Sequence, residues 1–325
     1  MGLKDGFSRI IDYMRVSVTD RCNLRCVYCM PDKGVPAVTH DDILRYEEIT
    51  RIISVAAELG VRKIRITGGE PLFRRNVQSL IRDLKRLNAI DDLSLTTNGM
   101  LLERYAEELK DAGLNRVNVS LDSLRPERYR EITCGGDLDT VMKGIEKALN
   151  IGLDPVKINM VPIRGMNDDE IEEFGRLTIN TPYHVRFIEF MPVGNGSFYD
   201  ENKRITTDEI KERIGVLGAL EPVRVRKNGP AKYYMLPAAQ GVIGFISGMT
   251  HHFCRDCSRL RLTADGKLRP CLFSETEIDL RSALRRGATD EELKRLLKLA
   301  VEVKPEGHYI LEKEEGGRPM SRIGG

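Results

Sequence analysis

The stretch YMRVSVTDRCNLRCVYCM, residues 13–30, joins a β-rich run to three closely spaced cysteines. Cys22, Cys26 and Cys29 form a CxxxCxxC pattern with no fourth ligand in sight, apart from the sequence-distant His40. A cubane [4Fe–4S] cluster normally takes four thiolates, so a trio leaves one iron open to a non-protein ligand. An open iron suits a cluster that binds a substrate better than one that only shuttles electrons. Zinc is the less favoured metal for so compact a loop.

The composition limits the classes of protein to which the chain can belong. The 51 Lys and Arg nearly cancel the 49 Asp and Glu, so no broad basic face for a nucleic acid polymer is expected. The sequence contains no run of about eighteen apolar residues and no signal peptide, so we expect no membrane association and a cytoplasmic location. Thiols stay reduced in that compartment, and clustered cysteines therefore indicate metal ligands before disulfides.

Further β-rich runs follow the first, and amphipathic segments with helical spacing separate them. The runs cover residues 13–18, 62–67, 93–97, 116–121, 156–161 and 184–191. This alternation predicts an α/β fold with a parallel sheet. Chemistry-bearing residues stand at the carboxyl end of nearly every run, which is typical of the rim of a parallel barrel. Six strands are fewer than the eight of a closed barrel. The sequence therefore predicts an open-sided, six-stranded partial β/α barrel.

The regular alternation stops near residue 228. We expect a barrel core over residues 5–227 and a C-terminal region over residues 228–325 that covers the open side. The C-terminal region carries a second trio of cysteines: Cys254, Cys257 and Cys271. On spacing alone, this trio also suits a structural zinc site with His251 or His252 as the fourth ligand. The seventh cysteine, Cys134, is expected to be a small, partly buried side chain.

Several cations interrupt or flank apolar strands. They are Arg15, Arg65, Lys157, Arg259 and Arg261. A buried cation is costly unless it is paired, so two interpretations remain open. The first three cations could form structural ion pairs, for example with Glu70 or Asp122. Alternatively, all five could surround a polyanion such as a triphosphate, since charge-assisted contacts to phosphate are strong. The sequence has no phosphate-binding glycine motif, so side chains would have to hold any nucleotide.

Two motifs together make the chain recognisable. The first trio, with Tyr28 before its last cysteine and GGEP at residues 68–71, resembles the radical S-adenosylmethionine superfamily. The second trio, spaced CxxC and then thirteen residues before the last cysteine, and the terminal Gly324-Gly325 narrow the resemblance. The chain is similar, over essentially its whole length, to the GTP 3′,8-cyclases that begin molybdenum-cofactor biosynthesis.

The resemblance implies cofactors, a reaction and roles for individual residues. It implies two [4Fe–4S] clusters, one per trio, and S-adenosylmethionine bound at the open iron of the first cluster. A 5′-deoxyadenosyl radical would abstract hydrogen from C3′ of GTP. The sugar carbon would then attack C8, giving (8S)-3′,8-cyclo-7,8-dihydroguanosine 5′-triphosphate. The residues implied to bind S-adenosylmethionine are Tyr28, Gly69, Ser120 and Met191. Those implied to bind GTP are Arg15, Arg65, Thr96, Lys157, Arg259, Leu260 and Arg261. The catalytic set is Arg15, Arg259, Arg261, Gly324 and Gly325.

The same resemblance implies partners. They are an electron donor that is flavodoxin- or ferredoxin-like, and cyclic pyranopterin monophosphate synthase, which takes the product. The enzyme would be a monomer or a homodimer.

Two rival interpretations remain. One is a radical S-adenosylmethionine enzyme that modifies a peptide with the help of an auxiliary cluster, although such enzymes usually carry more C-terminal cysteines. The other is a non-catalytic zinc-binding protein.

Overall fold

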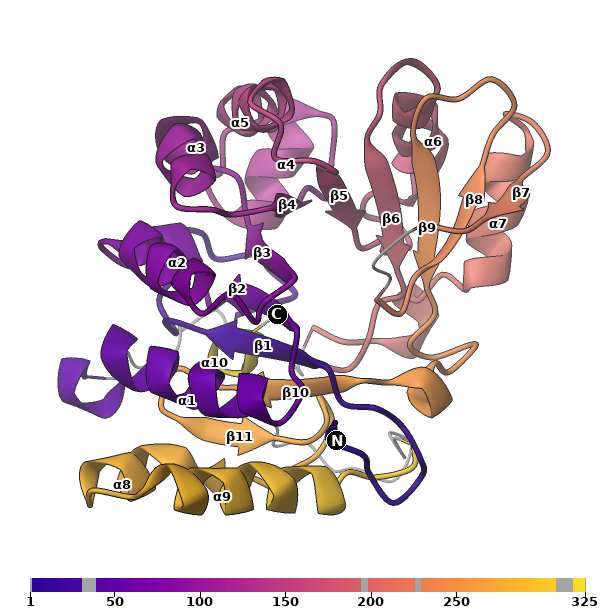
Figure 1. Ribbon diagram of the computed structural model, residues 1–325. Helices are drawn as coiled ribbons and strands as arrows, with labels where there is room; N and C mark the ends of the chain where they lie inside the picture. The colour runs from indigo at the N-terminus through magenta and orange to yellow at the C-terminus, as the bar shows by residue number, and fades with distance from the viewer. Residues whose placement is uncertain (1, 31–38, 194–197, 226–228, 308–317, 325) are drawn as a thin grey trace.

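The computed structural model describes residues 2–30, 39–193, 198–225, 229–307 and 318–324. Its strands form one twelve-stranded sheet in the order β12-β11-β10-β1-β2-β3-β4-β5-β6-β9-β8-β7 (Figure 1). The strands follow an arc in Figure 1, with most of the helices on its outer side and α10 inside it. The expected α/β fold with a predominantly parallel sheet is confirmed, but the expected number of six strands is wrong.

The centre of the sheet is the part that the sequence predicted. It consists of β1 (Tyr13–Ser17), β2 (Lys63–Thr67), β3 (Asp92–Thr97), β4 (Arg116–Ser120), β5 (Lys157–Met160) and β6 (His184–Ile188). All neighbouring pairs within this block are parallel. Each strand matches one β-rich run of the sequence to within a few residues. The helices between them provide the crossovers that a parallel sheet requires.

The remaining strands come from the second half of the chain. β10 (Arg259–Leu262) pairs in parallel with β1, and β9 (Val242–Ile246) pairs in parallel with β6. Antiparallel strands continue both sides: β11 (Lys267–Arg269), β12 (Ile278–Asp279), β8 (Lys232–Met235) and β7 (Glu221–Val223). These strands connect largely through turns and loops, so the strand–helix alternation does not reveal them. The C-terminal half therefore extends the same sheet on both sides.

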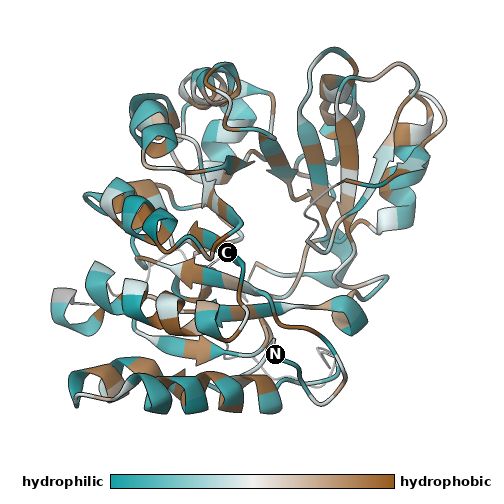
Figure 2. Cartoon of the chain, in the orientation of Figure 1, coloured by the Kyte–Doolittle hydropathy of each residue, from teal (hydrophilic) through white to brown (hydrophobic). Residues whose placement is uncertain are grey.

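Amphipathic helices cover the sheet. They are α1 (Tyr46–Glu58), α2 (Val77–Arg86), α3 (Leu102–Asp111), α4 (Pro126–Thr133), α5 (Leu138–Asn150), α6 (Ile171–Asn180), α7 (Thr207–Gly215), α8 (Leu280–Arg285), α9 (Asp290–Glu302) and α10 (Met320–Ile323). Short 3₁₀ helices lie at η1 (His40–Asp42), η2 (Pro71–Phe73), η3 (Asp168–Glu170), η4 (Glu201–Lys203) and η5 (Cys254–Asp256). In α2, burial of Val77, Leu80, Ile81 and Leu84 follows the helical period. Figure 2 shows hydrophobic residues along the strands and on one side of the helices.

One continuous hydrophobic core joins the two halves of the chain. It includes Ile64 of β2 and Val185 of β6, and also Leu260 of β10 and Leu297 of α9. No described helix combines the length and apolar character needed to cross a bilayer.

Candidate active site

A cavity of about 290 Å³ lies at the carboxyl ends of the parallel strands. Every parallel strand contributes to its lining, with Arg15, Arg65, Thr96, Ser120, Asn159, Arg186, Ile246 and Arg259 among the residues involved. All six cysteines of the two trios also line it: Cys22, Cys26, Cys29, Cys254, Cys257 and Cys271. The fold therefore brings together two cysteine groups that are more than two hundred residues apart in the sequence.

The first cysteine loop follows β1 and is held by main-chain hydrogen bonds. The amide of Cys29 donates to the carbonyl of Cys26 at 2.9 Å. The amide of Val27 donates to the carbonyl of Ile132 in α4 at 3.0 Å, which fixes the loop to the helix. The Cys22 thiol accepts from its own loop and from the Asn98 side-chain amide, at 3.7 Å. The loop is therefore preformed around its three thiols.

Among the described residues, the charges that act on the thiols of the first trio come from carboxylates and from one another, not from a cation. Burial raises the pKa of Cys29 to about 12, and it raises the pKa of both Cys22 and Cys26. A metal ligand must be a thiolate. The site therefore favours a ligand that brings its own positive charge, as the irons of a cluster do.

The GGEP segment lies directly against this cysteine loop. The amide of Gly69 donates to the carbonyl of Thr19 at 2.7 Å, and that of Glu70 donates to the carbonyl of Arg21 at 2.8 Å. A Cβ atom on Gly69 would collide with the Arg21 carbonyl. The absence of a side chain at Gly69 is thus already required by the approach of these two backbone segments, before any ligand is considered.

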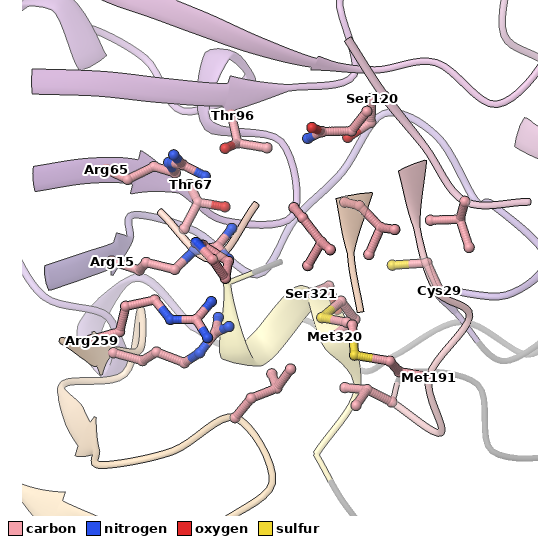
Figure 3. Close-up of a pocket in the computed structure, with 18 of the residues that line it drawn as sticks. Arg15, Cys29, Arg65, Thr67, Thr96, Ser120, Met191, Arg259, Met320 and Ser321 are labelled. Carbon is pink, nitrogen blue, oxygen red and sulfur yellow. The ribbon is translucent and has the colours of Figure 1, made fainter. Parts of the chain in front are cut away.

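The other residues expected to bind S-adenosylmethionine also line the cavity. Tyr28, Ser120 and Met191 lie in the lining, and Figure 3 shows Ser120, Met191 and Cys29 facing the same space. The Tyr28 hydroxyl donates to a carboxylate oxygen of Asp122 at 2.5 Å. Burial raises the pKa of Asp122 to about 6, although hydrogen bonds from Tyr28 and from the Val161 amide oppose that rise.

The arginines lie side by side on adjacent strands. In the sheet register Arg15 of β1 stands opposite Arg65 of β2 on one side and opposite Arg261 of β10 on the other. Burial lowers the pKa of Arg65 to about 10 and, together with Arg259, that of Arg261 to about 9. Within the described ranges, no carboxylate forms an ion pair with any of these four arginines. The site therefore concentrates positive charge that no described carboxylate neutralises.

The ion-pair interpretation fails for the two acids that were considered. Glu70 accepts hydrogen bonds from the amides of Leu72 and Asn98 and from the hydroxyl of Thr97, and its pKa is raised to about 7 by burial. Asp122 accepts from Tyr28 and from a backbone amide. Both carboxylates are thus satisfied by neutral donors rather than by the cations.

Several buried polar atoms of the site have no hydrogen-bond partner among the described residues. They include Nε of Arg15, Nε of Arg65 and Oγ1 of Thr96. Buried polar groups are nearly always hydrogen-bonded in folded proteins, so unpaired ones at a cavity indicate places for a ligand's atoms. The two guanidinium groups require acceptors, as phosphate oxygens would be. Figure 3 shows Arg15, Arg65 and Arg259 on one side of the cavity and Cys29 with Met191 on the other.

Three expected site residues, Lys157, Leu260 and Gly324, are not among the residues that line the cavity. Lys157 is buried, donates to the Tyr233 hydroxyl at 3.1 Å and is not among the residues that line the cavity. The side chain of Leu260 is fully buried in the hydrophobic core. The carbonyl of Gly324 accepts from Nη1 of Arg261 at 2.7 Å. Gly325 lies outside the described residues.

Some residues that line the cavity were not expected from the sequence. Arg186 of β6 lines the cavity and donates to the side-chain oxygen of Asn118 at 2.8 Å. Its signal was present, since HVRFIEFM places a cation inside a β-rich run just as IRIT does. Met320 and Ser321 of α10 also line the cavity, and no pattern in the glycine-rich tail indicated them. Cys134, expected to be partly buried, is exposed at the C-terminal end of α4, where it adopts the left-handed conformation with φ of 52°.

The second cysteine trio is set among cations. Burial alone would raise the pKa of Cys257, but the Arg259 guanidinium and the Lys304 ammonium outweigh it and lower the pKa to about 6. No three His, Cys, Asp or Glu side chains of the described ranges converge as the ligands of one metal ion do. His251 instead lies 3.0 Å from Asp208, and a ring nitrogen of His252 lies 3.0 Å from the carbonyl of Gly248. The three thiols of this trio, with Cys257 favoured as a thiolate, are donors that fit an iron–sulfur cluster.

Comparison with known proteins agrees with this geometry. Residues 16–178 match the family model of the radical SAM superfamily, and residues 183–310 match that of molybdenum cofactor synthesis C. The crystal structure of Streptococcus suis SuiB bound to precursor peptide SuiA has a similar fold. Its TM-score is 0.62 at 16% identity, over 91% of this chain and 66% of that longer chain. Fold and cysteine loop together define a radical S-adenosylmethionine protein.

Full-length relatives narrow the class further. A GTP 3′,8-cyclase of Heliobacterium modesticaldum is 52% identical over 99% of both chains. One of Thermodesulfovibrio yellowstonii is 52% identical over 99% of this chain and 100% of its own. The chain belongs to the GTP 3′,8-cyclase family.

Proposed function

We propose that this protein converts GTP to (8S)-3′,8-cyclo-7,8-dihydroguanosine 5′-triphosphate, the first step of molybdenum-cofactor biosynthesis. The observation that carries the proposal is the cavity between the two cysteine trios, in which several arginines form no ion pair with any carboxylate of the described residues. A nucleoside triphosphate supplies the missing negative charge, and its base and sugar then lie between the trios. The names of the full-length relatives support the same reaction.

The first trio is proposed to hold a [4Fe–4S] cluster through Cys22, Cys26 and Cys29. When bound, this cluster and S-adenosylmethionine supply the 5′-deoxyadenosyl radical that starts the reaction. Tyr28, Gly69, Ser120 and Met191 are proposed to position S-adenosylmethionine. Tyr28 and Gly69 belong to the two backbone segments that pack together at this end of the cavity.

The second trio is proposed to hold another [4Fe–4S] cluster, through Cys254, Cys257 and Cys271, that orients the guanine. Arg15, Arg65, Arg259 and Arg261 bind the triphosphate, and Thr96 offers its unpaired hydroxyl. Leu260 acts through the packing that orients its two arginine neighbours in β10. Lys157, beside the lining, takes up a proton and becomes positively charged when the triphosphate binds. These groups hold GTP in a fixed pose and exclude water from it, which is the protein's share of the chemistry.

The C-terminal tail is proposed to complete the site. Arg261 binds the Gly324 carbonyl, and Met320 and Ser321 of the same tail line the cavity. On this basis Gly324 and Gly325 are proposed to act in the reaction.

The wider setting is proposed as follows. The curved sheet acts as an open-sided barrel, with residues 5–227 as the radical core and residues 228–325 as the cluster-binding extension. A flavodoxin- or ferredoxin-like protein in the cytoplasm supplies electrons, and cyclic pyranopterin monophosphate synthase takes the product. The enzyme acts as a monomer or a homodimer.

The decisive experiment is an anaerobic incubation of the reconstituted chain with GTP, S-adenosylmethionine and a reductant. We expect 5′-deoxyadenosine together with a product that has the mass of GTP and a new carbon–carbon bond. A matched reaction lacks only GTP. 5′-Deoxyadenosine without a GTP-derived product would favour another radical substrate, such as a peptide. A colourless protein that contains zinc and cleaves nothing would refute both enzymatic interpretations.

A further inference from the structure

Lys304 is a buried cation beside the second cysteine trio. It follows the end of α9, and only 3% of its surface is exposed. Its ammonium group donates to the carbonyl of Arg259 at 2.9 Å and to the carbonyl of Pro270 at 2.6 Å. It also lies 3.7 Å from the sulfur of Cys257. Because Pro270 precedes Cys271, one side chain connects the segments that carry two of the three thiols.

A second buried cation of this region, Arg9, differs from Lys304 because it has a carboxylate partner. Arg9 donates to the carbonyl of Cys254 at 2.7 Å, but its guanidinium forms an ion pair of 2.6 Å with the buried carboxylate of Asp5. Within the described part of the chain, no carboxylate forms such a pair with Lys304. The charge of Arg9 is therefore compensated by the protein, whereas that of Lys304 is not.

An uncompensated ammonium in the protein interior requires a nearby negative charge. The nearest groups that can carry one are the thiols of the second trio. The net charge of a thiolate-bound cluster becomes more negative by one unit on reduction. A fixed cation and hydrogen bonds near the sulfurs therefore favour the reduced state and raise the reduction potential.

We propose that Lys304 is a positioning residue of the second cluster, which ties the Cys257 and Cys271 segments together and raises the reduction potential of that cluster through its charge. The proposal rests on the proposed function, because it requires that the second trio binds a cluster. It assigns to Lys304 no contact with GTP or with S-adenosylmethionine.

The test uses the full-length chain in which Cys22, Cys26 and Cys29 are replaced, so that bound iron reports on the second trio alone. Lys304→Gln removes the charge, and Lys304→Arg keeps it. Lys298→Gln is the matched control, because Lys298 is an exposed lysine of α9, the helix that precedes Lys304. Each variant is reconstituted anaerobically, and iron content and reduction potential are measured.

We expect Lys304→Gln to lower the equilibrium constant for reduction at least tenfold, a shift of about 59 mV to more negative potential for one electron. Lys304→Arg and Lys298→Gln should keep the parent potential. If Lys304→Gln loses its iron, retention of iron by Lys304→Arg still supports the need for the charge, and loss in both overturns it. An unchanged potential in Lys304→Gln refutes the inference alone. A parent chain without iron at the second trio refutes the proposed function together with it.

Discussion

Nη1 of Arg261 donates a hydrogen bond of 2.7 Å to the main-chain oxygen of Gly324, across 63 positions of sequence. This bond places the end of the tail against the sheet. Gly324 has φ of +81°, and an added Cβ would lie 2.9 Å from Cγ2 of Thr67 and 3.1 Å from Cβ of Ser17. The position is buried, so the tail has a defined place that its composition does not predict.

The first prediction concerns this glycine. Gly324→Ala should strongly lower GTP cyclisation, because a left-handed alanine costs about 1–2 kcal/mol and its methyl group meets β1 and β2. The four-residue helix α10 should detach before the sheet deforms, so the melting temperature should barely change. Iron content and product formation are measured in parallel. Gly307→Ala is the control, since an added Cβ there meets nothing within 4 Å. Full cyclisation by Gly324→Ala would show the tail to be inert.

The second prediction concerns Arg65, whose charge is expected to destabilise the free protein but to strengthen the binding of GTP. Arg65→Met should raise the unfolding free energy of the protein without GTP by about 1–4 kcal/mol, because it removes a half-buried charge whose Nε has no hydrogen-bond partner among the described residues. The same variant should bind GTP about 10- to 200-fold more weakly, since a charge-assisted hydrogen bond contributes about 1.5–3 kcal/mol. Thermal unfolding with and without GTP measures both effects. A variant that is less stable without GTP, and equally stabilised by it, would contradict the assignment.

The third prediction is a pH dependence of GTP binding. Burial, with help from Arg186, Arg116 and Arg65, lowers the pKa of Lys157 from its ordinary value of 10.5 to about 5. In the free protein near pH 7 this lysine is therefore neutral, and a bound triphosphate would raise its pKa. Binding then takes up a proton, so affinity falls as pH rises between the two pKa values.

Calorimetry in two buffers with different ionisation enthalpies measures that proton uptake. Lys157→Met should lose the part of the uptake that belongs to the lysine, while the part due to the phosphate groups remains. Equal uptake by the parent and the variant would show that Lys157 does not change its protonation on binding.

The fourth prediction separates the two trios. Replacing Cys22, Cys26 and Cys29 should halve the iron content and abolish cleavage of S-adenosylmethionine. Replacing Cys254, Cys257 and Cys271 should also halve the iron but spare some uncoupled cleavage while cyclisation is lost. Cys134→Ala is the control, because this thiol is exposed and should change neither quantity. A full iron content after the second replacement would favour a non-cluster role for those cysteines.

The sequence predicted the parts of the fold that repeat. The apolar runs and the amphipathic segments between them predicted the six central strands, and the cations within the runs predicted most of the arginines that line the cavity. The strand of Val242–Ile246 was missed because no helix follows it, and the sheet register that places Arg15 between Arg65 and Arg261 depends on a crossover of more than two hundred residues. Local patterns contain no information on such a pairing.

The unexpected site residues have the same explanation. Lys304 appears in a polar stretch after a helix, where a solvated lysine is the usual case. Only the tertiary structure shows that carbonyl groups of two distant segments surround it. Conversely, Gly69 was expected to make room for a ligand, yet its contact with the Arg21 carbonyl follows from strand–loop packing.

The pairing of β10 with β1 and of β9 with β6 decides how the chain can be divided. A fragment that ends at residue 227 would leave β1 and β6 with bare backbone donors and acceptors, and such strand edges recruit other chains. The radical core is therefore expected to self-associate or precipitate when it is produced alone. Fusion or grafting of this catalytic unit must retain the second half of the chain for solubility as much as for chemistry.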